Sequence, residues 1–174
     1  MGNTVDKSRK NIRQKSSSDI FSTKVMGILG DSLTDKERKK KLREVYYAEA
    51  VRYKENAKKY LGKAKVDNKG HYEDKKYVRT ACGVAYSGLL IALDCLFILN
   101  GIEINGETKK DIVFYKYNLN NRVHTNRKLG GNFDSAYEIL HLLGYYNGIT
   151  SSSIVKEGFK ELDMFIELIN PNKA

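Results

Sequence analysis

The chain has 174 residues, a net charge of +10, one proline, two cysteines and no tryptophan. That length suits one domain with an additional segment, and two cysteines exclude the dense disulfide framework on which small secreted proteins depend. A single proline leaves helices uninterrupted, so the composition favours a cytoplasmic, all-α protein.

The positive charge is concentrated near the N-terminus, where residues 1–43 hold twelve Lys or Arg against five Asp or Glu. We expect residues 1–33 to form a basic, flexible extension, because this composition buries too little apolar surface to order itself. The alternative is a basic arm that follows nucleic acid or another anionic surface. Within the extension, residues 21–29 (FSTKVMGIL) form an apolar patch that we expect to dock on the folded domain or on a partner.

The first long helix is predicted to begin at residues 34–37 (TDKE), which have the capping-box pattern. Apolar residues then recur at steps of three and four, as in one buried helical stripe: Leu42, Tyr46, Ala50, Tyr53, Ala57, Tyr60 and Ala64. The opposite face is rich in lysine (Lys54, Lys58 and Lys63). We interpret it as solvated surface, with phosphate binding as the less favoured interpretation. Residues 67–70 (DNKG) then turn the chain.

Residues 77–100 (YVRTACGVAYSGLLIALDCLFILN) form the most apolar stretch, with Ser87 and Asp94 as its strongly polar side chains after residue 81. A helix that is apolar on nearly all sides is either buried in a core or crosses a membrane. Asp94 would be costly inside a bilayer, and Asn100-Gly101 is a helix stop rather than an interfacial anchor. We therefore expect the core helix of a bundle and no membrane partner.

Small residues gather in the first half of this helix, among them Gly83, Ser87 and Gly88. Glycine inside a helix costs about 1 kcal/mol relative to alanine, so these positions predict the close approach of another backbone. The partner is either the first long helix of the same chain or a second copy, which makes these three residues candidates for the contact face of a homodimer. Cys82 and Cys95 are thirteen positions apart, roughly 20 Å along a helix, and cannot bond to each other within it.

Three further helices are predicted from start and stop signals. The first begins at residues 108–111 (TKKD) and ends at Asn120-Asn121, and the second is capped by Asn132 and precedes a turn at residues 144–148. The third runs from residues 151–153 to Asn170-Pro171. The pattern predicts an all-α, up-and-down bundle of about five helices over residues 34–170, with a short tail at 171–174.

The linker at residues 122–131 (RVHTNRKLGG) is the strongest candidate for an anion or nucleic-acid site. Two glycines expose backbone amides ahead of a helix N-terminus, and cationic residues lie close by: Arg122, His124, Arg127 and Lys128. The sequence does not match the P-loop pattern, so an ordinary basic linker is the alternative.

Other ionisable residues give weaker candidates. The three histidines, at positions 71, 124 and 141, are far apart in the sequence, and none has the spacing of metal ligands. We therefore predict no metal site at His71, His124 or His141 and no cofactor. Asp94 is the ionisable group of the apolar helix. It is either a functional carboxylate or half of a structural pair with a Tyr hydroxyl or a basic side chain of a neighbouring helix.

The helices in this order resemble the HEPN bundle, the higher eukaryote and prokaryote nucleotide-binding domain, over roughly residues 47–169. The resemblance rests on AEAVRYKENAKKYLGKA, AYSGLLIALDCLFILNG and FDSAYEILHLLGYYNG. More closely, YEDKKYVRTA, AYSGLLIALD, DIVFYK and FDSAYEILHLLGYYNG resemble an uncharacterised bacterial domain family of unknown function. The resemblance implies an up-and-down bundle, a homodimer, and nucleic acid or a toxin–antitoxin protein as partner.

HEPN ribonucleases carry an Arg, four to six residues and then a His near the end of the fourth helix. The corresponding place here reads LLGYYNGIT, without either residue. The sequence therefore favours a non-catalytic, dimeric binding module. The alternatives are a HEPN-type ribonuclease or toxin–antitoxin component using Arg122, His124 or Arg127, and a nucleic-acid binder that uses the basic N-terminal arm.

Overall fold

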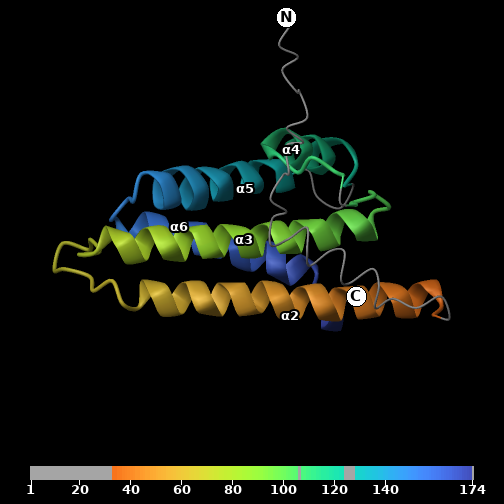
Figure 1. Ribbon diagram of the computed structural model, residues 1–174, viewed down its shortest axis with the longest axis horizontal. Helices are drawn as coiled ribbons and strands as arrows, with labels where there is room; N and C mark the ends of the chain where they lie inside the picture. The colour runs from red at the N-terminus through yellow and green to blue at the C-terminus, as the bar shows by residue number, and fades with distance from the viewer. Residues whose placement is uncertain (1–32, 106, 124–127, 174) are drawn as a thin grey trace, which may run out of the picture.

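The computed structural model describes residues 33–105, 107–123 and 128–173. These residues form an all-α, up-and-down bundle, as predicted (Figure 1). The helices in chain order are α2 (Asp35–Leu61), α3 (Lys75–Leu99), α4 (Ile112–Asn121), α5 (Leu129–Ala136), the π-helix η1 (Tyr137–Tyr146), α6 (Ser152–Leu168) and the 3₁₀ turn η2 (Pro171–Lys173). The expected flexible extension falls almost entirely outside the described residues.

α3 lies at the centre of the bundle, between α2 on one side and the continuous α5–η1 rod on the other, with α6 behind it (Figure 1). Every residue from Ile91 to Phe97 is buried. By length and composition α3 is the one helix among those described that is long and apolar enough to cross a membrane, but most of that apolar window is buried inside the bundle. α3 is therefore the core helix that its sequence predicts.

The capping box predicted at the start of α2 is confirmed. The Thr34 hydroxyl accepts a hydrogen bond from the Glu37 amide at 3.3 Å, and the Thr34 amide donates to the Glu37 carboxylate at 3.0 Å. Leu42, Tyr46 and Ala50 are buried against the core, as their spacing requires.

The small residues of α3 are used for packing within the chain. A Cβ at Gly88 would lie 3.0 Å from the Tyr53 Cβ on α2, and Gly88 is buried. A Cβ at Gly83 would lie 2.9 Å from the ring of Tyr145 on η1. Ser87 donates its hydroxyl hydrogen bond to the Gly83 carbonyl one turn earlier, at 3.1 Å. Of the two partners that the sequence left open for Gly88, α2 of the same chain is the one that approaches it, and a contact face between two copies stays a prediction.

Two predicted helix starts are shifted in the structure. α4 is capped by Asp111, whose carboxylate accepts from the Phe114 amide at 3.0 Å, and Thr108 lies in the preceding loop. α5 begins at Leu129, so Asn132 lies inside the helix rather than at its cap. Gly130 and Gly131 thus belong to the first helical turn, which has no side-chain cap.

η1 continues α5 without a break, so the predicted turn at residues 144–148 starts later, at Asn147 and Gly148. A ten-residue π-helix is unusual, since this winding is mostly confined to single turns inside α-helices. It brings Gly144 so close to α3 that a Cβ there would lie 2.6 Å from the Cys82 Cβ. The chain then turns at Gly148, which has a φ of +65°, and enters α6.

Candidate functional site: a basic aromatic face on α2 and α3

The linker predicted to bind anions is only partly described by the structure. Arg122 follows the last residue of α4, Lys128 precedes the first residue of α5, and both are exposed. His124 and Arg127 lie outside the described residues. The anion site at this linker therefore remains a prediction.

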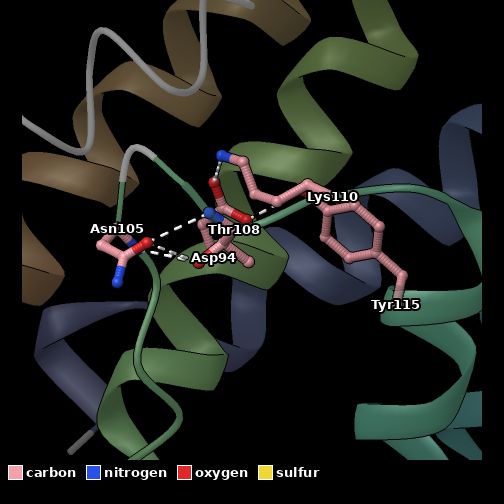
Figure 2. Close-up of polar contacts among 5 residues, drawn as sticks. All are labelled: Asp94, Asn105, Thr108, Lys110 and Tyr115. Atoms are coloured by element: carbon pink, nitrogen blue, oxygen red, sulfur yellow. Dashed lines mark hydrogen bonds and ion pairs between the residues drawn. The ribbon is translucent and has the colours of Figure 1, made fainter.

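Asp94 is fully buried on α3 and has donors on both carboxylate oxygens (Figure 2). The Tyr115 hydroxyl donates to Oδ1 at 2.9 Å, and the Lys110 ammonium donates to Oδ2 at 2.8 Å. The Lys110 side chain is only 5% exposed, so this is a buried ion pair. Of the two interpretations that the sequence left open, the observed contacts are those of a structural pair.

The loop that carries Lys110 is itself cross-linked by hydrogen bonds. The Asn105 carboxamide oxygen accepts from the Thr108 amide at 3.0 Å, and the Thr108 hydroxyl accepts from the Asn105 amide at 3.0 Å (Figure 2). These bonds restrict the loop just before Lys110, so they help to hold the ammonium at the carboxylate. The ion pair in turn fastens the approach to α4 onto the core helix.

A surface pocket of about 440 Å³ lies where α2 and α3 meet. One wall consists of residues that recur on an outer face of α2, followed by one residue from the turn after the helix: Arg52, Tyr53, Asn56, Lys59 and Tyr60, then Lys63. Val84 of α3 lines the opposite side. Tyr53 and Tyr60 belong to the predicted apolar stripe, but Tyr60 is 37% exposed and lines this pocket instead of the core.

Cations and aromatic rings alternate around the pocket. The Arg52 guanidinium lies 4.9 Å from the centre of the Tyr53 ring, and the Lys63 ammonium lies 5.3 Å from the centre of the Tyr60 ring. Two parallel hydrogen bonds of 2.7 and 2.6 Å join Arg52 to Glu49 and raise the pKa of the guanidinium, which therefore stays charged. Cation–π contacts of this kind hold the charges beside flat ring faces.

The pocket was not singled out from the sequence, although one of its signals was present. Lys63 belongs to the lysine-rich face for which phosphate binding was the less favoured interpretation. Lys54 and Lys58 of that same face are paired, with Asp163 at 2.9 Å and with Glu55 at 3.6 Å. The aromatic half of the site could not be recognised, because Tyr60 has the spacing of a core residue.

A second aromatic group lies on η1, around His141. The His141 ring is 4.5 Å from the Tyr86 ring, stacks on Tyr137 at 5.1 Å and meets the edge of Tyr146 at 4.9 Å. Burial lowers the pKa of His141, which favours the neutral imidazole. Tyr146 is 59% exposed, so part of this group is available to a ligand.

The two aromatic groups border neighbouring residues of α3. Tyr145 of η1 covers Gly83, and the next residue, Val84, lines the α2 pocket. A basic, ring-lined pocket and an exposed aromatic group thus border the same strip of the core helix. Together they offer positive charge for an anion and flat surfaces for a planar ring.

Comparison with known proteins gives a family but no assigned activity. Residues 45–171 match the model of a domain of unknown function, DUF5618. A protein of unknown function from Dyadobacter fermentans has a solved structure that is 35% identical over 76% of this chain and 98% of that chain, with a TM-score of 0.62. No curated protein matches. The wider HEPN resemblance is not confirmed by these matches. The chain therefore belongs to the DUF5618 family of domains of unknown function.

Proposed function

We propose that this protein is a non-catalytic binding module that holds single-stranded nucleic acid on the face shared by α2 and α3. The observation that carries the proposal is the pocket in which Arg52, Lys59 and Lys63 alternate with tyrosine rings. Amines and guanidinium groups attract phosphates, and exposed rings stack on bases that are not already stacked in a duplex.

The aromatic group on η1 favours a nucleic-acid strand, rather than a single phosphate ion, as the ligand. Tyr145 and Tyr146 are 46% and 59% exposed and lie across the Gly83–Val84 strip from the basic pocket. Base stacking on an aromatic side chain contributes about 1–3 kcal/mol per base. A strand that spans both groups gains phosphate contacts at one side of the strip and stacking at the other.

The charge distribution supports the same ligand. Residues 1–43 contain twelve Lys or Arg against five Asp or Glu, and this excess covers both the N-terminal extension and the start of α2, the helix that forms the pocket wall. A basic arm adds affinity that is independent of base sequence and weakens with salt. The arm is then an accessory to the pocket rather than the whole of the binding site.

The test is fluorescence anisotropy with labelled single-stranded and duplex oligonucleotides, as RNA and as DNA, over a series of salt concentrations. We expect tighter binding of single strands. The double variant Lys59→Glu/Lys63→Glu should bind at least tenfold more weakly and lower the log–log salt slope by about 1.4, since each lost phosphate contact removes about 0.7. Lys41→Glu/Lys156→Glu, which changes the charge equally at exposed positions outside the pocket, is the matched control.

If the two double variants bound the oligonucleotides with equal affinity, the pocket would not be the binding site. Loss of binding only on deletion of residues 1–32 would instead favour the alternative in which the arm alone binds nucleic acid. The ribonuclease alternative is tested by incubating RNA with the wild type and with His124→Ala. Cleavage that disappears in the variant would overturn the non-catalytic assignment.

We propose a cytoplasmic homodimer as the assembly, as the sequence predicts. Gly88 of the expected contact face is covered by α2 of the same chain. Light scattering at micromolar concentration should give twice the chain mass, and a monomeric mass would contradict the dimer.

A further inference from the structure

An apolar pocket of about 460 Å³ lies at the C-terminal end of α3. It is lined by a short run of the chain that follows the helix: Ile98, Gly101, Ile102, Glu103, Ile104 and Asn105. Gly101 has a φ of +74°, which glycine adopts without strain, and the Ile102 amide donates to the Phe97 carbonyl at 2.9 Å. The turn therefore folds the isoleucines back beside the end of the helix.

This end of α3 is also where the N-terminal part of the chain enters the bundle. α2 and α3 run antiparallel, so α2 begins at the end of the bundle where α3 stops (Figure 1). Residue 29 precedes Thr34 by five positions, which an extended chain spans in roughly 17 Å. Residues 21–29 are thus tethered near the end of the bundle that carries the pocket.

The sequence of residues 21–29 suits an apolar groove. Phe21, Val25, Ile28 and Leu29 have the i, i+4, i+7, i+8 spacing that places all four on one side of a helix. Amphipathic helices of this pattern lay their apolar side chains into hydrophobic grooves. Lys24 of the segment and the exposed Glu103 at the pocket supply opposite charges.

We propose that residues 21–29 of the same chain dock in this pocket as a short amphipathic helix. The occupant is the chain's own segment, because it is covalently held within reach at about millimolar effective concentration. Docking would tether the basic residues 7–15, which precede the segment, to this end of the bundle. The proposal is independent of what the α2 pocket binds.

Fluorescence tests the docking directly, because the chain contains no tryptophan. Phe21→Trp places a reporter on the apolar side of the segment, and Thr23→Trp places the matched control about 200° away around the same helix. We expect a blue-shifted emission maximum and at least threefold weaker acrylamide quenching for Phe21→Trp than for Thr23→Trp. Adding Ile28→Asp, which leaves the bundle unchanged, should restore the emission and quenching of an exposed tryptophan.

Cross-linking tests the place of docking. Leu29→Cys combined with Glu103→Cys should form a disulfide under mild oxidation, whereas Leu29→Cys combined with Glu157→Cys on α6 should not. Equal quenching of the two tryptophan variants, or no response to Ile28→Asp, would overturn the proposal. Shielding that disappears on dilution from 50 to 0.5 µM would also overturn it, since the segment would then dock on a second copy.

Discussion

The Lys110 ammonium lies 2.8 Å from the Asp94 carboxylate, and neither side chain is more than 5% exposed. The pair joins the middle of the bundle to the loop before α4, a separation of sixteen positions in the chain. Tyr115, which donates to the other oxygen of Asp94, lies on α4 itself. Asp94 therefore connects three consecutive parts of the fold: α3, the loop and α4.

Removing one member of this pair should be strongly destabilising. Asp94→Leu leaves a buried ammonium without its carboxylate and should lower the free energy of unfolding by about 3–5 kcal/mol in urea denaturation. The double variant Asp94→Leu/Lys110→Met buries no charge and should be more stable than Asp94→Leu alone by about 2 kcal/mol. If the losses of Asp94→Leu and of Lys110→Met alone add up to the loss of the double variant, the pair contributes no coupling energy.

Two glycines should respond to alanine in opposite directions. Gly144→Ala would place a Cβ 2.6 Å from the Cys82 Cβ and should destabilise the protein by about 1–3 kcal/mol. Gly131 has nothing within 4 Å of the same position and lies inside α5, so Gly131→Ala should stabilise it by about 0.5–1 kcal/mol. Thermal melts of the two variants and of the wild type measure both changes in stability. A similar Tm in both variants would argue against the close approach of η1 to α3.

The two cysteines should be unreactive in the native protein. Burial raises the pKa of the Cys82 and Cys95 thiols to about 12, so at pH 8 only about one thiol in ten thousand is ionised. Ellman's reagent should detect no thiol in the folded protein within minutes and two after denaturation in guanidinium. Rapid reaction of one thiol in the native state would indicate that α3 is accessible from outside the bundle.

His141 should make stability depend on pH. Because burial lowers the pKa of His141 in the fold, the unfolded chain binds more protons just below its ordinary pKa of about 6.5. The contribution is complete above about pH 6.5 and is lost as the pH falls below that value towards the folded pKa. Urea denaturation at pH 5.5 and 7.5 should show a smaller difference for His141→Gln than for the wild type. An equal difference would assign the dependence to other groups.

The sequence predicted those parts of the fold that depend on local signals. The Thr34–Glu37 capping box and the helix stop at Asn100-Gly101 depend on contacts between residues that are close in the sequence, and both lie where they were expected. The start of α4 was misplaced because Thr108 has the residue type of a cap but bonds to Asn105, while Asp111 caps the helix. Two acceptable capping residues three positions apart compete, and only the surrounding loop decides between them.

The candidate site depended on contacts that local patterns do not contain. Asp94 was recognisable as exceptional, but its partners Lys110 and Tyr115 are sixteen and twenty-one positions away. To predict the basic pocket, one would need to know which lysines form ion pairs and which tyrosines of the stripe are exposed, and neither can be read from the sequence. The π-winding of η1 has no sequence signal in a run that also fits an α-helix.

That winding gives the aromatic surface an unusual dependence on chain length. η1 is wound with i→i+5 hydrogen bonds, so removing one residue from its interior would let the segment return to α-helical winding and change the directions in which its side chains project. Tyr145 would then leave Gly83, although no aromatic residue had been replaced. A relative that lacks one residue here would keep the bundle and lose the surface, so helix pitch would distinguish family members that residue identity alone groups together.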